Sequence, residues 1–267
     1  MRHKTSTTIM TTKFFIATLL FCLASNSTGA TVAPLTFCFE DVAQRPWSQP
    51  DGSGLNIKLL KRVEKLLGER FIYISKPWKR CQEEVRMGIV DGFFGAADSA
   101  ERRLYSVFPT RPDGSVDAEA ALYEDRFNVY LRSLGRGVWD GKKLSSPQRP
   151  VVAQRGYLVA ALLREQGVAI NDTIKTADEG LTLLANGHAD VAVLQGMEAE
   201  DLASLHSKFK AVVVQSPMPY AVLPLHLAIN KNTYARDTKR IAAIWAAIRS
   251  ERKSSDYRKL LDAAGVK

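Results

Sequence analysis

The hydrophobic positions of the chain change spacing from segment to segment, and this predicts strands and helices in alternation. Leu35 to Phe39 is a short apolar run of the kind that forms a buried strand. A turn at residues 51–54 is followed by apolar positions at helical spacing, which predict a helix that ends near Gly68. The β-branched and aromatic run at residues 71–74 predicts the next strand, which ends before Pro77.

Residues 81–87 predict a second helix, which stops at Gly88, and residues 89–94 predict a third strand. The order strand, helix, strand, helix, strand is typical of a parallel sheet with helices on its faces. Similar strands and helices are expected in the second half of the chain, at residues 151–153, 157–166, 176–185 and 191–194. Each half also carries a Gly-x-x-Asp motif between a helix and a strand, which suggests two similar α/β lobes.

The remaining segments add to this pattern without changing the fold class. We expect three further extended segments and then two helices, at residues 122–131, 212–214, 225–229, 233–249 and 255–264. The sequence therefore predicts an α/β protein throughout.

The first 30 residues have the three-part layout of a secretory signal peptide. Basic residues up to Lys13 precede an apolar run from Phe14 to Ala24, and a small and polar stretch ends at Ala30. The apolar run is too short to span a bilayer as a helix, and a buried core helix is the alternative. We predict cleavage after Ala30, so that residues 1–30 are removed and the mature protein is periplasmic.

The composition is that of a globular protein, with 46% hydrophobic and 24% charged residues. The 267 residues leave room for one large domain or two smaller ones with hydrophobic cores. The formal net charge is +9 and would fall to about +6 without the signal peptide, which mildly favours acidic ligands. The basic residues are spread out without a run of five, so we expect no nucleic-acid partner.

Export would leave Cys38 and Cys81 as the only cysteines of the mature protein, in a compartment where disulfides persist. One interpretation is a disulfide between them, and two separate buried thiols are the alternative. The sequence has no Cys-x-x-Cys motif, and its four histidines lack the spacing of metal ligands. We therefore expect neither a metal ion nor another cofactor.

Four stretches carry short motifs in a definite order. They are Pro46-Trp47 with Gly54-Leu55-Asn56-Ile57-Lys58-Leu59, Trp78 with Gly88-Ile89-Val90-Asp91, Gly95-Ala96-Ala97-Asp98-Ser99-Ala100-Glu101-Arg102, and Gln154-Arg155-Gly156-Tyr157 with Gly187-His188-Ala189-Asp190. In order and spacing they resemble the bacterial extracellular solute-binding proteins of family 3, components of ABC transporters that typically bind polar amino acids. The similarity covers essentially the whole mature chain, and Cys38 and Cys81 resemble those of a divergent branch of that family.

The resemblance implies a type II periplasmic-binding-protein-like fold of the α/β class, in which two lobes are joined by two hinge crossings. Each lobe would be a mainly parallel sheet flanked by helices, lobe 1 formed by residues 31–122 and 222–267 and lobe 2 by residues 123–221. It also implies a monomer that captures a small polar, carboxylate-bearing solute, such as an amino acid, in the cleft between the lobes. Closure by hinge bending would precede delivery to an inner-membrane ABC permease.

The resemblance also assigns ligand-binding roles to several side chains. Arg102 matches the position that holds the carboxylate of the ligand, and a guanidinium can donate two parallel hydrogen bonds to such a group. The alternative is a surface arginine that pairs with Glu101 or Asp98. Trp78 matches a position that packs on the ligand, and a core tryptophan is its alternative. Asp41 matches a position that contacts basic ligand groups in some relatives, whereas a helix cap or a solvated acid is the alternative.

The second lobe contributes the remaining candidates. Gln154 and Tyr157 flank a turn between a strand and a helix, where backbone N–H groups would favour an anionic group. Two positions depart from the family pattern. Ala97 replaces a threonine that helps to hold the carboxylate, and Gln195 stands where amino-acid binders carry an aspartate for the α-ammonium. A neutral amide does not offset the desolvation of an ammonium as a carboxylate does, so a ligand with an anionic group and an uncharged remainder fits equally well.

Two other function classes stay open. An exported enzyme on the same scaffold, similar to cyclohexadienyl dehydratase, would need an acid or base with a shifted pKa in the cleft. Asp41 and Glu198 are possible by position, but neither lies in a recognisable catalytic motif, so we expect no enzymatic activity. The other alternative is a sensor or binding protein that is not linked to transport.

Overall fold

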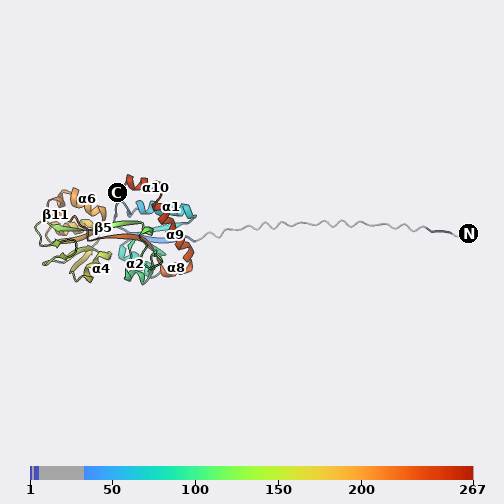
Figure 1. Cartoon of the computed structure of the whole chain (residues 1–267), viewed down its shortest axis with the longest axis horizontal. Coiled ribbons are helices and arrows are strands. Elements are labelled where there is room, and N and C mark those ends of the chain that lie inside the picture. The colour runs from blue at the N-terminus through green and yellow to red at the C-terminus, as the bar shows by residue number, and fades with distance from the viewer. Residues whose placement is uncertain (2, 6–32, 267) are drawn as a thin grey trace. The chain divides into compact units, whose positions relative to one another are not determined.

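Strands β5 (Tyr123–Arg132) and β12 (Ala221–Asn230) lie at the centre of the sheet and pair in antiparallel fashion (Figure 1). The computed structural model describes residues 1, 3–5 and 33–266. The apolar run and the cleavage site of the predicted signal peptide lie outside these residues and stay predictions. The other strands of the sheet are β1 (Leu35–Glu40), β2 (Phe71–Lys76), β3 (Gly92–Ala97), β4 (Ser106–Val107), β8 (Val151–Gln154), β9 (Ile170–Ile174), β10 (Val191–Gln195) and β11 (Val213–Gln215).

The order of the strands shows how two halves are joined. It is β2-β1-β3-β12-β5-β10-β8-β9, with β4 added to β12 and β11 to β5. In the first half β1 pairs in parallel with β2 and β3, and in the second half β8 pairs in parallel with β10 and β9. Between them, β5 pairs first with β12 and then with β10, and β12 pairs first with β5 and then with β3. Both long strands therefore run from one half into the other, as two crossings between lobes require.

We call the half that contains β1–β3 the first lobe and the half that contains β8–β10 the second lobe. This arrangement confirms the predicted two-lobed α/β fold, in which the strands of each lobe are mainly parallel and two crossings join the lobes, and it unites all ten strands in one continuous sheet. The residue limits of the lobes given above stay a prediction. A separate two-stranded sheet, β6 (Val138–Trp139) with β7 (Leu144–Ser145), was not predicted.

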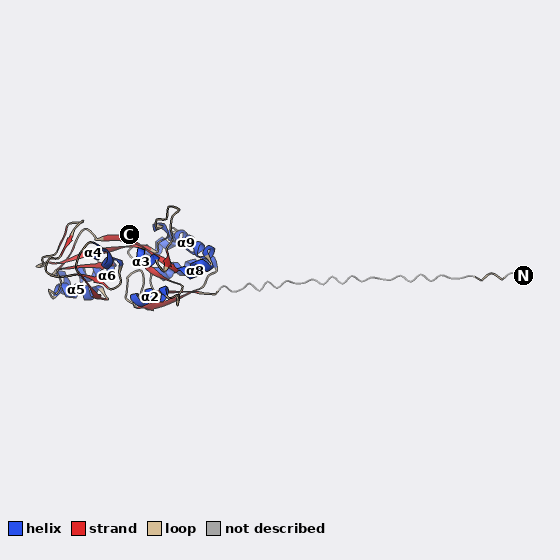
Figure 2. Ribbon diagram, turned by 90° about the horizontal axis from the view of Figure 1, so that it is seen from below, coloured by secondary structure: helices blue, strands red, loops and turns tan. Residues whose placement is uncertain are grey.

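Helices cover both faces of the sheet (Figures 1 and 2). They are α1 (Leu55–Leu67), α2 (Trp78–Arg86), α3 (Ala100–Arg103), α4 (Leu158–Glu165), α5 (Ala177–Ala185), α6 (Gly196–Leu205), α7 (Ser207–Lys210), α8 (Lys231–Arg236), α9 (Thr238–Arg252) and α10 (Ser255–Ala263), with a short 3₁₀ helix, η1 (Ala118–Ala120). None of the helices in the described residues has the length and hydropathy that a membrane crossing requires.

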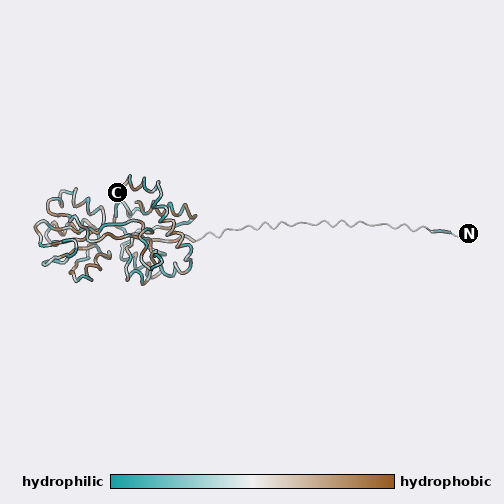
Figure 3. The backbone as a smooth tube through the Cα atoms, in the orientation of Figure 1, coloured by the Kyte–Doolittle hydropathy of each residue, from teal (hydrophilic) through white to brown (hydrophobic). Residues whose placement is uncertain are grey.

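Three hydrophobic clusters form the core, and neighbouring strand residues belong to different clusters. Phe93 packs in the cluster that contains α2, whereas Phe94 packs in the one that contains α1 and α9. In the second lobe, Ala192 faces α5 and Val193 faces α4. Because successive side chains of a strand point to opposite faces, a continuous apolar run is the pattern of a strand covered on both sides. Figure 3 shows hydrophobic stretches of chain in the middle of the molecule, where the strands of the sheet lie.

Some elements differ from the sequence-based expectation. The third strand begins at Gly92 and not at Ile89, because the Ile89 N–H donates to Glu84 O and continues the end of α2. The helix predicted over residues 233–249 is divided at Asp237, whose carboxylate accepts the Arg240 N–H and caps α9. Strand β9 was not predicted, because its sequence is mostly polar and its side chains are only partly buried.

The repeated Gly-x-x-Asp motif has a structural role in both lobes. The Asp91 carboxylate accepts hydrogen bonds from the Thr36 N–H and the Thr233 hydroxyl, both at 2.9 Å. Asp190 is buried and forms ion pairs with Arg132 at 3.4 Å and Arg149 at 3.5 Å. In each lobe the aspartate thus fastens the start of a strand to a neighbouring segment.

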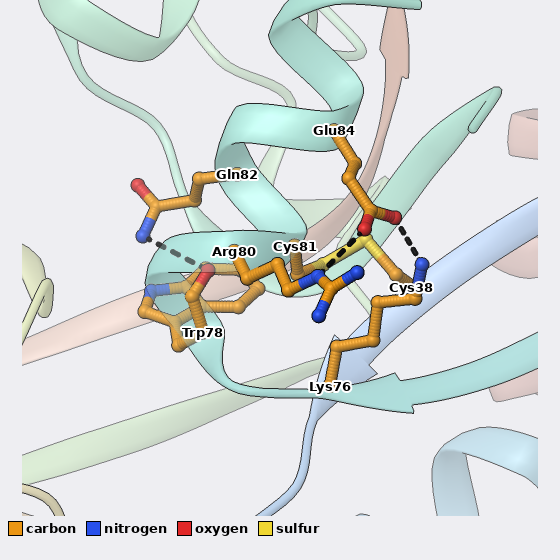
Figure 4. The surroundings of a disulfide bond; sticks show 7 residues. All are labelled: Cys38, Lys76, Trp78, Arg80, Cys81, Gln82 and Glu84. Atoms are coloured by element: carbon orange, nitrogen blue, oxygen red, sulfur yellow. Dashed lines mark hydrogen bonds and ion pairs between the residues drawn. A yellow bond between two sulfur atoms is a disulfide. The ribbon is translucent and has the colours of Figure 1, made fainter. Parts of the chain in front are cut away.

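A disulfide joins Cys38 of β1 to Cys81 of α2, which confirms the predicted pairing (Figure 4). Both cysteines are fully buried. The same helix is also tied to the end of β2 by the ion pair of Glu84 with Lys76, while Arg80, on α2 itself, pairs with the other Glu84 oxygen. The disulfide therefore fixes α2, which begins with Trp78, against the strand that ends at Glu40.

Candidate functional site

A small cavity lies where the two lobes meet at β5 and β12. Its volume is about 30 Å³, room for roughly two water molecules. Both lobes contribute its walls, which are formed by Phe39, Glu40, Gln44, Ser48, Trp78, Phe94, Gly95, Ala97, Arg102, Tyr123, Phe127, Tyr157, Leu158, Gln195 and Leu225. We call it the inner cavity. An outer cavity of about 360 Å³ adjoins it and shares Gln44 and Gln195 with it.

Arg102 brings a buried positive charge to the inner cavity. It lies on α3, where Ser99 caps the helix by accepting the Arg102 N–H. Only 5% of Arg102 is exposed, and its guanidinium donates to the carbonyl oxygens of Ala97 at 2.7 Å and Gly156 at 3.2 Å. No ion pair with an acidic residue is found for Arg102 within residues 33–266. Burial lowers its pKa, and a buried cation without a counter-ion favours an anion beside it.

The neighbouring arginine has a different environment. Arg103 is partly exposed and forms a two-pronged ion pair with Asp98, with both nitrogen–oxygen distances at 2.7 Å. Asp98 therefore pairs with Arg103 and not with Arg102.

The Gly156 carbonyl oxygen joins the two lobes. It accepts hydrogen bonds from Trp78 Nε1 at 3.1 Å, Arg102 Nη2 at 3.2 Å and Gln82 Nε2 at 3.4 Å. Gly156 has a φ of +79°, and a Cβ there would lie 3.1 Å from Lys79 Cε. The backbone conformation therefore favours glycine at this turn, and a Cβ there would also press on the flexible end of Lys79.

The side chain of Trp78 packs in two environments at once. Its ring stands edge-on to Phe93 at 5.5 Å, and the Arg102 guanidinium lies over it, 5.4 Å from the ring centroid. Only 7% of Trp78 is exposed. The core and cavity interpretations of this tryptophan therefore do not exclude each other.

Tyr157 precedes α4 and makes a second contact between the lobes. Its hydroxyl accepts a hydrogen bond from Gln44 Nε2 at 2.7 Å, and burial raises the pKa of Tyr157 well above its usual range. Leu158, the first residue of α4, also lines the inner cavity, which is thus next to the positive end of the helix dipole.

Gln154, Gln195 and Asp125 form a buried hydrogen-bonded chain. The Gln195 N–H donates to Gln154 Oε1 at 3.0 Å, and Gln195 Nε2 donates to Asp125 Oδ2 at 2.9 Å. All three residues are at most 7% exposed. Burial raises the pKa of Asp125 to about 6.

Acidic side chains lie at the mouth between the two cavities. Glu40 lines the inner cavity, and burial, followed by its hydrogen bond to Asp41, raises its pKa to about 8. Asp41 lines the outer cavity and forms an ion pair with Lys175 of the second lobe at 2.8 Å. Glu198 lines the outer cavity as well, and burial raises its pKa.

The structure brings most of the predicted residues to one place. The inner cavity is lined by Trp78, Ala97, Arg102, Tyr157 and Gln195, whereas Asp41 and Gln154 line the outer cavity. Their ligand-binding roles stay predictions. Sequence analysis missed Glu40, Gln44 and Asp125. Residues 40 and 44 lie close to the predicted Asp41, so their position after the first predicted strand could have indicated them as site residues. Nothing in the sequence pointed to Asp125.

Within the described residues, no group of three or more His, Cys, Asp or Glu side chains could hold a metal ion. The polar side chains that line the inner cavity instead carry amides, hydroxyls, one indole N–H, one guanidinium and one carboxyl group. This set suits hydrogen bonding to a small polar molecule.

Comparisons with known proteins show the fold. No protein-family model matches the sequence, and no curated protein is significantly similar to it. A histidine kinase sensor domain with similarity to periplasmic binding proteins is 18% identical, with a TM-score of 0.67 over 86% of this chain and 95% of that one. The arginine-, lysine-, histidine-binding protein ArtJ from the thermophilic bacterium Geobacillus stearothermophilus is 16% identical, with a TM-score of 0.66 over 88% of this chain and 96% of that one.

A third similar structure is an ancestral amino acid-binding protein, described as a precursor of cyclohexadienyl dehydratase. It is 18% identical, with a TM-score of 0.64 over 86% of this chain and 94% of that one. The chain thus has the two-lobed fold of periplasmic-binding-protein-like proteins.

Proposed function

We propose that this chain is a periplasmic solute-binding protein, a divergent member of the extracellular solute-binding family 3. It would take up a small polar solute that carries a carboxylate, such as an amino acid or a related compound, between its lobes. It would act as a monomer and deliver the solute to an inner-membrane ABC permease. The observation that carries this proposal is Arg102, a guanidinium that is 5% exposed, lines the cavity between the lobes and has no acidic partner in residues 33–266.

The geometry of Arg102 suggests how a solute would be held. A carboxylate that replaces the Gly156 carbonyl as partner would gain two charge-assisted hydrogen bonds and would neutralise the buried charge. The Trp78 ring would cover one side of the solute. Since the inner cavity holds only about two water molecules, we infer that the solute enters while the lobes are apart and that the lobes then close over it less fully than in this structure.

The location follows from the predicted signal peptide, and two similar structures support the solute class. One is a binding protein for arginine, lysine and histidine, and another is an ancestral amino acid-binding protein. One similar structure is a histidine kinase sensor domain, so a sensing role is an alternative for this chain. A sensor would bind the same solute without a permease.

A ligand screen by thermal shift tests the proposed function. We expect an amino acid or small organic acid to raise the melting temperature of the purified protein in a concentration-dependent way. Arg102→Ala should abolish this rise, measured against the melting temperature of the variant itself without ligand. The matched control is Arg103→Ala, which removes the adjacent arginine on the surface and should keep the full response. A full response in Arg102→Ala would refute the assignment of Arg102.

Glu40 favours a second candidate function, an enzyme on the same scaffold. A carboxyl group with a pKa of about 8 keeps its proton at neutral pH and could act as a general acid in the inner cavity. A precursor of cyclohexadienyl dehydratase has the same fold. Mass spectrometry of a bound cyclic carboxylic acid would decide, because loss of water from the compound indicates catalysis and Glu40→Gln should abolish it. An unchanged compound in a stoichiometric complex would argue for binding alone.

A further inference from the structure

A buried carboxylate stands directly behind Gln195. Asp125 is 5% exposed, and its two oxygens accept hydrogen bonds from the Arg126 N–H at 2.8 Å and from Gln195 Nε2 at 2.9 Å. Within residues 33–266, no lysine, arginine or histidine forms an ion pair with it. An ionised carboxylate at this depth is costly unless a positive charge comes close.

The hydrogen bond to Asp125 fixes the orientation of the Gln195 amide. An ionised carboxylate only accepts hydrogen bonds, so the NH₂ end of the amide must face Asp125. The amide oxygen then stays available as an acceptor at the wall that Gln195 forms for both cavities. A carboxylate bonded to the NH₂ group also polarises the amide and strengthens its oxygen as an acceptor.

The backbone approaches this carboxylate closely. Gly196 has a φ of +83°, and a Cβ there would lie only 3.2 Å from Asp125 Oδ2 and 3.8 Å from Gln44 Oε1. Glycine at position 196 therefore keeps a side chain from pressing against Asp125 and Gln44.

We propose that Asp125 supplies, through the Gln195 amide, the negative charge for a cationic group of the solute, so that the preferred solute is a zwitterion. This inference rests on the proposed function, in which Arg102 takes the carboxylate of the same solute. A guanidinium and a carboxylate, both buried and both without a counter-ion among the described residues, would then be neutralised together by one small molecule. Asp125 acts here as a positioning and charge-compensating residue, and the direct contact to the solute comes from Gln195.

The ionisation of Asp125 gives the proposal a pH signature. Burial, opposed by the hydrogen bonds from Gln195 and Arg126 and assisted by the charge of Glu200 on α6, raises its pKa to about 6. A cation that binds nearby would favour the ionised form and release the proton. The affinity for a zwitterion should therefore rise as the pH increases from 5 to 7.

Calorimetric titrations with matched compounds test the proposal. The probes are L-amino acids, each compared with the 2-hydroxy acid of the same side chain, which lacks the ammonium group. We expect the protein to bind the amino acid at least about tenfold more tightly at pH 7.5, and we expect this preference to shrink at pH 5. Asp125→Asn should lose the preference and the pH dependence while it keeps binding to the hydroxy acid.

Two further variants separate charge from structure. Glu200→Gln removes a nearby acid that bonds to Asn128 and should keep the preference. The double variant Asp125→Asn with Gln195→Asp moves the carboxylate to the cavity wall and should restore the preference for the amino acid. If Asp125→Asn does not fold, proton release from the unmodified protein, measured from the binding heat in two buffers, provides the same test.

The outcomes distinguish this inference from the proposed function. Tight binding of amino acids by Asp125→Asn with an unchanged pH profile would overturn the role of Asp125 and leave the proposed function intact. Equal binding of amino acids and hydroxy acids by the unmodified protein would also overturn the role of Asp125 and leave the proposed function intact. Binding of neither class would overturn the proposed function and this inference with it.

Discussion

Burial shifts the pKa values of three ionisable side chains around the inner cavity toward their uncharged forms. Burial lowers the pKa of Arg102 and raises the pKa values of Glu40 and Asp125. In each case the protein carries a desolvation cost that packing in this region must offset. Perturbed groups that gather in one cleft are a typical property of functional sites.

Glu40 allows this cost to be measured as a pH dependence of stability. In the unfolded chain its carboxyl group loses its proton near pH 4.5, whereas in the folded protein it keeps the proton to about pH 8. The folded state thus binds more protons between these values, so stability should fall as the pH rises by up to about 1.4 kcal/mol per pH unit.

Denaturant unfolding at pH 5, 6, 7 and 8 checks this expectation. Glu40→Gln should flatten the decline, and the control Glu101→Gln, at a highly exposed site, should keep it. Parallel curves for the protein and Glu40→Gln would show that Glu40 is ionised in the folded state.

The residue scale also shows what the sequence could and could not predict about the site. Arg102 and Arg103 are adjacent, and only the spacing of the family motif indicated that Arg102 is the ligand-binding candidate. Arg102 is also the one of the two that is buried. Gln44 and Asp125 became visible only in the fold, because their partners Tyr157 and Gln195 lie 113 and 70 residues away. Their burial depends on how distant segments pack, and no local pattern encodes it.

At the scale of elements, hydrophobic periodicity predicted those helices and strands that have a continuous apolar face. Helix α1 was expected to end near Gly68, which indeed has a left-handed conformation at its C-terminus. Strand β9 was not predicted, because it is an edge strand with partly exposed side chains and has no continuous apolar face. The break at Asp237 depends on a capping hydrogen bond in the middle of an otherwise suitable helical pattern.

The disulfide connects two elements that carry cavity residues, β1 with Glu40 and α2 with Trp78. Replacing both cysteines, as Cys38→Ala with Cys81→Ala, should lower the free energy of unfolding by about 4 kcal/mol, because the loop between them spans 43 residues. Chemical denaturation measures this loss. The unmodified protein in reductant should approach the stability of the variant, which itself should not respond to reductant. If the double variant were as stable as the oxidised unmodified protein, this expectation would be wrong.

At the scale of the whole molecule, the lobes are held together by polar contacts that involve no solute. Lys175 pairs with Asp41, Gln44 donates to Tyr157, and three side chains donate to Gly156 O. The ion pair is partly exposed and contributes at most about 1 kcal/mol. The Gln44–Tyr157 hydrogen bond and the donors to Gly156 O are better shielded from water, so we infer that together they contribute most to the closed form.

Trp78→Phe tests this inference, because it removes the Nε1 donor and keeps an aromatic ring. A hydrogen bond contributes about 1 kcal/mol on average, so the ratio of open to closed molecules without solute should rise about fivefold. Small-angle X-ray scattering should record this rise as a larger radius of gyration. Trp139→Phe is the matched control, because its Nε1 donates to Met218 O at 2.9 Å and not to Gly156 O, and its scattering should not change. If Trp78→Phe also scatters like the unmodified protein, the Gly156 carbonyl does not hold the lobes together and closure must depend on the solute.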